Sequence, residues 1–131
     1  MAKTKNHTKE REEWLALVRK LCDDIKSWAE EEHWFVHEDH KTIRGEKIGE
    51  YEVPVLLIRA GAGRISVEPI GREIVGADGR VDIGAFPTFD RMVLVRTKGK
   101  WVLETDHCEV WPVPWSREAF LEVVETLAAA R

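Results

Sequence analysis

The stretch Arg91-Met92-Val93-Leu94-Val95-Arg96-Thr97, with the turn Lys98-Gly99-Lys100 and the run Trp101 to Asp106 behind it, decides the fold of this chain. Apolar residues dominate the first run, and a short glycine-containing turn separates it from the second. Two β-type runs joined by such a turn are typical of an antiparallel hairpin. The same period of two extends back to Thr42, which predicts a series of short strands from 42 to 106.

The chain after this hairpin predicts a terminal helix. Pro112 and Pro114 keep the segment from Val110 to Trp115 extended. Ser116 is a good N-cap, and Trp115 before it can pack on Phe120 inside the helix as a hydrophobic staple. The apolar positions of this helix form one stripe: Ala119, Phe120, Val123, Val124 and Leu127.

The other end of the chain predicts a longer amphipathic helix. It is expected to begin near Thr8, a fair N-cap, and residues 1–7 are expected to be frayed. Apolar residues then recur at spacings of three and four, the period of a helix that buries one face: Trp14, Leu15, Val18, Leu21, Cys22, Ile25, Trp28 and Ala29. The helix is predicted to end near Glu32, with an edge strand after it, although one more helical turn is an alternative for residues 31–39.

Turn-forming residues divide the strand region between the helices. Pro54 interrupts the strand predicted over residues 50–60, which indicates an edge position or a bulge. Gly61-Ala62-Gly63 is a short turn, and Asp78-Gly79 favours a hairpin turn, after a run that includes Glu73 to Val75. Phe86 to Asp90 is expected to join two further strands.

Together these elements predict one α+β domain over residues 1–131. Its antiparallel sheet has about five to seven strands, flanked by the N-terminal and C-terminal helices. Each helix has one apolar stripe, and the sheet needs at least one covered face. The simplest arrangement therefore packs both helices on the same face of the sheet.

Composition limits the classes of function. Hydrophobic residues make up 44% of the chain, charged residues 34%, and the net charge is −4, so nucleic acid is not an expected partner. No long apolar run or signal-peptide pattern is present, which predicts no membrane partner and a cytoplasmic location. Cys22 and Cys108 do not form a disulfide framework, and Cys22 is expected to be a buried small hydrophobe.

A group of histidines gives the first candidate site. His33, His37 and His40 have Glu38 and Asp39 among them, and His107 and Cys108 could join them in space. On a helix the three histidines would share one face, whereas on a strand His40 would point away from the other two. Imidazoles and carboxylates that converge hold divalent metals, so a metal-dependent hydrolase is the alternative function. No cofactor is otherwise expected.

Carboxylates on the predicted strands give a second, weaker candidate for metal-dependent or acid–base chemistry. Alternation along the strands explains most of them as outward polar positions. The residues concerned are Glu52, Glu68, Asp82, Asp90 and Glu104.

Aromatic residues give the third candidate. The chain has six tryptophans, of which Trp14 and Trp28 belong to the predicted helix stripe. An aromatic groove for a peptide or ligand would use Trp34, Phe86, Phe89, Trp111 and Trp115. Packing of the same rings in the seam between sheet and helices is the competing interpretation.

No catalytic constellation is complete in the sequence, while large aromatic residues are in excess. We therefore expect a non-catalytic binding or adaptor module for a protein partner. Self-association through strand edges or the Phe86–Phe89 loop is a further expectation.

Overall fold

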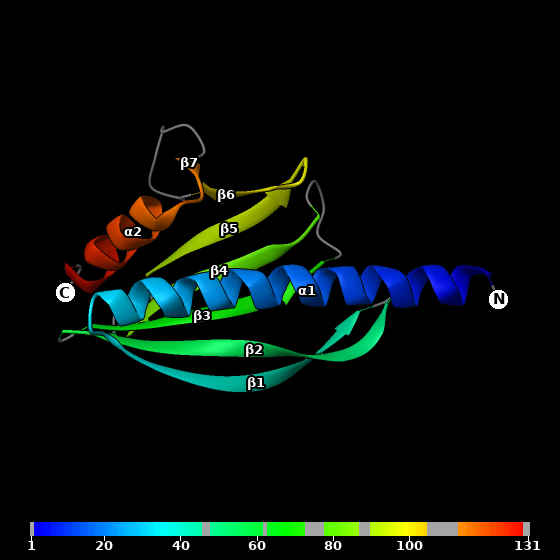
Figure 1. Cartoon of the computed structure of the whole chain (residues 1–131), viewed down its shortest axis with the longest axis horizontal. Coiled ribbons are helices and arrows are strands. Elements are labelled where there is room, and N and C mark those ends of the chain that lie inside the picture. The colour runs from blue at the N-terminus through cyan, green and yellow to red at the C-terminus, as the bar shows by residue number, and fades with distance from the viewer. Residues whose placement is uncertain are drawn as a thin grey trace.

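The computed structural model describes residues 2–45, 48–61, 63–72, 78–86, 90–104 and 113–129, and it confirms the predicted α+β class. One antiparallel sheet of seven strands has its strands in chain order, so every neighbour is a hairpin partner (Figure 1). The elements are α1 (Ala2–Glu31), β1 (Phe35–Gly45), β2 (Gly49–Ala60), β3 (Gly63–Gly71), β4 (Arg80–Phe86), β5 (Arg91–Thr97), β6 (Lys100–Glu104), β7 (Val113–Pro114) and α2 (Arg117–Ala129).

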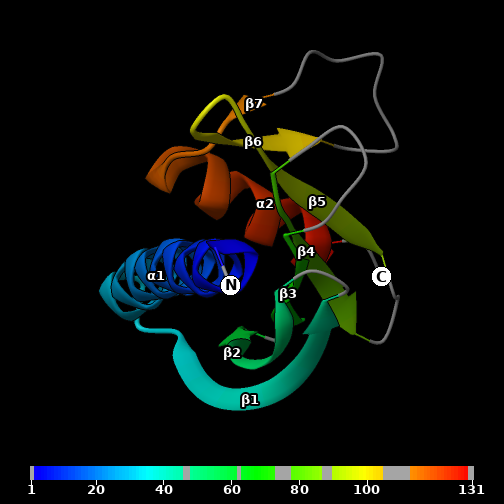
Figure 2. The same cartoon turned by 90° about the vertical axis from the view of Figure 1, so that its right-hand side faces the viewer.

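Both helices lie on the same face of the sheet, as the sequence predicts. Figure 2 shows that the sheet curves around α1 and α2, so the helices fill its concave side. The predicted helix stripes supply the core on that side, and Cys22 is buried there as expected. The sheet contributes alternate residues such as Leu56, Ile65 and Ile83. The opposite face of the sheet, called the outer face below, carries neither of the two helices that the structure describes.

Helix α1 is longer than predicted, because it begins at Ala2 instead of near Thr8. Its end agrees with the prediction. The Trp34 and His33 N–H groups donate to the Ala29 and Glu30 carbonyls, both at 3.0 Å, and His33 has a φ of 61°. This is the Schellman arrangement, which satisfies the last carbonyls of a helix and turns the chain sharply. The chain then enters β1, which is the predicted edge strand.

The β1–β2 hairpin explains the proline in the second strand. Pro54 lies opposite His40, and the ladder between β2 and β3 begins only at Leu56. Pro54 therefore lies where no third strand needs its missing N–H, which is the edge-like environment that the sequence indicates. The buried positions of β2 change there from odd to even numbers: Tyr51 and Val53 are buried before Pro54, and the even-numbered residues are buried after it.

The C-terminal helix begins as predicted. The Ser116 hydroxyl accepts a hydrogen bond from the Ala119 N–H at 3.1 Å, which is an N-cap. Trp115 lies against Phe120 with ring centroids 6.0 Å apart, which confirms the hydrophobic staple.

The Asp78-Gly79 pair lies at the end of the connection between β3 and β4. The Asp78 N–H donates to the Arg96 carbonyl at 2.7 Å, and the Arg96 N–H donates to the Gly79 carbonyl at 2.9 Å. The pair therefore extends the β4–β5 ladder rather than forming a tight two-residue turn. The predicted strand segment Glu73 to Val75 lies outside the described residues.

Gly79 provides a direct test of how α1 packs on the sheet. A Cβ atom at this position would lie 2.4 Å from Cζ3 of Trp14, a fully buried ring. We expect Gly79→Ala to lower the free energy of unfolding by about 1–3 kcal/mol, because the ring must move within a packed core and because an alanine is strained at the Gly79 φ of 155°. Urea denaturation measures the change.

The matched control is Gly71→Ala, since a Cβ there meets no atom within 4 Å. It should leave the unfolding midpoint unchanged or slightly higher. Equal effects of the two substitutions would contradict the packing of Trp14 over Gly79.

Candidate functional site

The structure separates the three histidines of the predicted metal site. His33 occupies the left-handed position that ends α1, and its side chain is exposed. His37 and His40 lie on opposite faces of β1, because they are an odd number of residues apart on a strand. Within the described residues, no group of three or more His, Cys, Asp or Glu side chains is placed to hold a metal ion. His107 and Cys108 lie outside those residues.

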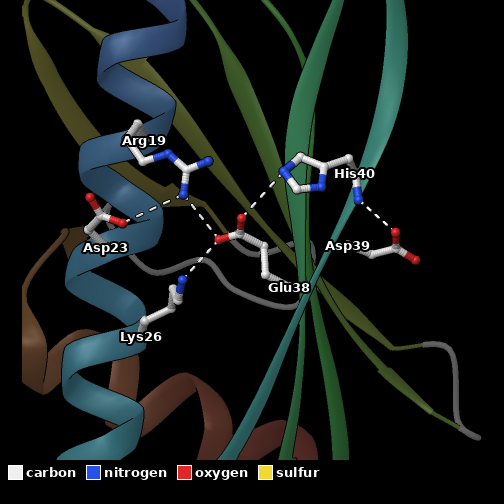
Figure 3. Close-up of polar contacts among 6 residues, drawn as sticks. All are labelled: Arg19, Asp23, Lys26, Glu38, Asp39 and His40. Atoms are coloured by element: carbon white, nitrogen blue, oxygen red, sulfur yellow. Dashed lines mark hydrogen bonds and ion pairs between the residues drawn. The ribbon is translucent and has the colours of Figure 1, made fainter.

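Glu38, between these histidines, joins the edge strand to the long helix (Figure 3). Its Oε1 atom lies 3.0 Å from both Lys26 Nζ and Arg19 Nη1, and its Oε2 atom lies 3.4 Å from His40 Nε2. Hydrogen bonds from Lys26 and Arg19 lower the pKa of the Glu38 carboxyl. Glu38 is therefore an ionised anchor between α1 and β1, and its oxygens are already occupied.

Two of the predicted binding aromatics pack in the seam between the two helices, whereas the competing interpretation places them between the sheet and the helices. Trp115 lies 6.0 Å from both Trp28 and Phe120, and Trp34 meets the edge of Phe120 at 6.1 Å. These rings stabilise the junction of α1 and α2 and do not adjoin Phe86. Trp111 and Phe89 lie outside the described residues.

Trp34 also lines a hollow of about 460 Å³ at the end of α2. Leu121 and Val124 form its apolar side, and Glu32 and Glu125 bring two carboxylates to its wall. These carboxylates make the hollow more polar than the one that Phe86 lines.

Phe86 belongs to a different surface, on the outer face of the sheet. It lines a hollow of about 470 Å³, called the outer groove, with Phe35, His37, Leu57, Arg59 and Arg64. Phe35 is 68% exposed, Phe86 46% and Leu57 42%, the largest exposed apolar side chains of the described residues. Exposed apolar side chains that gather in one hollow are typical of a contact surface.

The strand register brings these residues together from distant parts of the sequence. Phe35 lies opposite Arg59, Arg59 opposite Arg64, and Arg64 opposite Phe86. These four residues form one row across β1, β2, β3 and β4, called the Phe–Arg row. Leu57, opposite His37, lies one step further along the strands.

The sequence prediction included Phe86 but missed Phe35, Leu57 and both arginines. Leu57 sits at an outward position of a half-buried strand, where a polar residue is the usual choice. That break in alternation is a sign visible in the sequence, but only the register shows that it adjoins Phe35 and Phe86.

The carboxylates of the outer face near the groove have basic partners. Asp82 lies 2.7 Å from Arg80 and 3.4 Å from Arg91, and Glu68 lies 3.1 Å from Lys41. These ion pairs account for the two carboxylates without a metal ion or acid–base chemistry.

Cys22 does not offer a nucleophile. Burial raises the pKa of its thiol to about 12, and a buried thiol in apolar surroundings stays protonated and unreactive.

Comparisons of the chain with protein-family models, with curated proteins and with solved structures give no match. Among the described residues, no helix has the length and apolar character needed to cross a lipid bilayer.

The Glu38 anchor makes a pH-dependent prediction. Its pKa is lowered in the folded protein, so its stabilising effect is fully present above the ordinary glutamate pKa of about 4.3 and disappears as the pH falls through the lower folded-state value. We expect Glu38→Gln to lower the free energy of unfolding by about 1 kcal/mol or less at pH 7. The effect is small because the side chain is 20% exposed and water screens its charge. Urea denaturation at pH 7 and at pH 3 measures the difference from wild type.

The difference should shrink at the lower pH, as the Glu38 carboxyl takes up a proton and loses its charge. Glu50→Gln is the control, since Glu50 is 60% exposed and meets Arg44 only at 3.7 Å. A loss in Glu38→Gln that is the same at both pH values would contradict the ionised anchor.

Proposed function

We propose that this protein is a non-catalytic binding module, and that its outer groove holds a partner protein. The supporting observation is the gathering of Phe35, Leu57 and Phe86 on the outer face of the sheet. Large aromatic and aliphatic side chains supply most of the binding free energy at protein interfaces. Side chains held on paired strands also keep their positions before a partner arrives, which lowers the entropic cost of binding.

The curvature of the sheet favours this face over the other. The concave side is filled by α1 and α2, whose apolar stripes are buried. The outer face keeps exposed apolar groups beside charged ones, the mixture that a reversible interface uses. The alternative, a metal-dependent hydrolase built on His33, His37 and His40, gains no support from their placement on separate surfaces.

Site-specific photo-crosslinking in cells tests the proposal. A photoreactive phenylalanine analogue at position 86 should give a discrete adduct with another protein. The substitution Leu57→Glu should reduce the yield of that adduct at least several-fold, because a carboxylate in the apolar contact would lose its water on binding.

Val113→Glu is the matched control, since Val113 is 38% exposed and lies on β7. It should leave the adduct unchanged, and both variants should unfold at the wild-type temperature. An absence of adducts at position 86, or equal loss in the two variants, would overturn the proposal.

A further inference from the structure

The centre of the Phe–Arg row is a pair of arginines on neighbouring strands. Arg59 and Arg64 are directly opposite each other in the β2–β3 ladder, and both are exposed. Like charges directly opposite each other in a sheet destabilise it. Among the residues that the structure describes, neither guanidinium makes a hydrogen bond or ion pair.

Nearby acidic side chains do not relieve this pair. Glu68 is held by Lys41 at 3.1 Å, and Asp82 is held by Arg80 at 2.7 Å. Both carboxylates lie further along the strands than the Phe–Arg row, with Glu68 opposite Asp82. Within the described part of the chain, two uncompensated guanidinium groups therefore lie between two exposed phenyl rings.

We infer that the partner presents an extended acidic segment, with an aspartate or glutamate between two apolar residues. This inference rests on the binding function proposed above. A carboxylate accepts hydrogen bonds from guanidinium groups in a planar, bidentate geometry. The arginine pair would receive the carboxylate, and Phe35 and Phe86 would receive the flanking apolar side chains.

The spacing of the row sets the spacing of the segment. Phe35 and Phe86 lie three strands apart, which is about 14 Å at about 4.8 Å per strand. An extended chain advances about 3.4 Å per residue, and alternate side chains share a face. Residues i and i+4 of the segment therefore reach the two rings, and residue i+2 lies above the arginines.

The charge of the whole protein favours a peptide over nucleic acid. A chain of phosphates needs many uncompensated cations, because each contact contributes through counterion release. The net charge of this protein is −4, and the outer face carries Asp39, Glu68 and Glu104 on its strands. A single carboxylate matches the arginine pair without meeting these acidic groups.

Fluorescence anisotropy with two blocked, labelled peptides tests the inference. The acidic probe is acetyl-Ser-Leu-Thr-Asp-Thr-Leu-Ser-amide, and the matched probe has Asn in place of Asp. Wild-type protein should bind the acidic probe about tenfold more tightly than the amide probe, as charged hydrogen bonds predict. Arg59→Gln and Arg64→Gln should each lower the affinity for the acidic probe toward that for the amide probe. The affinity for the amide probe should stay unchanged.

Arg44→Gln is the control, because Arg44 is 85% exposed at the far end of the β1–β2 hairpin. It should keep the preference for the acidic probe. Thermal unfolding of Arg59→Gln and Arg64→Gln should not occur below the wild-type temperature, since each substitution removes a like-charge pair. A lower affinity in these variants would then report the site and not the fold.

Three results would overturn the inference. One is equal affinity for the two probes, or no binding of either; the crosslink at position 86 then decides separately whether the outer groove binds a partner at all. The second is tighter binding of a single-stranded oligonucleotide than of the acidic probe. The third is a dimer in sedimentation equilibrium that Leu57→Glu dissociates, which would make a second copy of this chain the occupant.

Discussion

The burial of α1 against the concave face of the sheet is the constraint on which the rest of the structure depends. Trp14, Val18 and Ile25 have no exposed surface, and they belong to the core that α1 shares with the sheet. Burial of side chains of this size contributes about 1.5–3 kcal/mol each. With both described helices on the concave side, no described helix covers the outer face, where the outer groove lies.

The edge strand β1 is anchored to the long helix. It has a neighbour on one side only, and it supplies Phe35 and His37 to the outer groove. Glu38 points the other way, toward α1, where Lys26 and Arg19 hold it (Figure 3). Alternation along the strand thus gives one face to the anchor and the other to the proposed contact surface.

Sequence patterns predict the parts of the fold that depend on neighbouring residues. The helix stripes, the Ser116 cap, the Trp115 staple and the hairpin from Arg91 are all local features, and the structure confirms them. The predicted start of α1 is too late, because Thr8 resembles an N-cap although the helix continues through it. His33 resembles a metal ligand in the sequence because other histidines and carboxylates lie near it. Nothing in the sequence indicates that this residue adopts the positive φ that ends α1.

The candidate site is less predictable because it depends on register. Phe35, Arg59, Arg64 and Phe86 come from four strands, and a shift of one residue in any pairing would move a side chain to the other face. Trp34 and Trp115 are the opposite case, because the sequence suggests them for a groove and the structure does not place them in the outer groove. Both pack on Phe120 in the seam between the helices. Aromatic content alone therefore identifies candidates, and topology selects among them.

The most direct measurement is an amide NMR titration of the full chain with the acidic peptide. The proposed binding site predicts that shift changes concentrate at Phe35, Leu57, Arg59, Arg64 and Phe86, while the amides of α1 and α2 stay in place. Changes concentrated at Trp34, Leu121 and Glu125, around the hollow at the end of α2, would contradict it. Saturable binding with no change along the Phe–Arg row would do so as well.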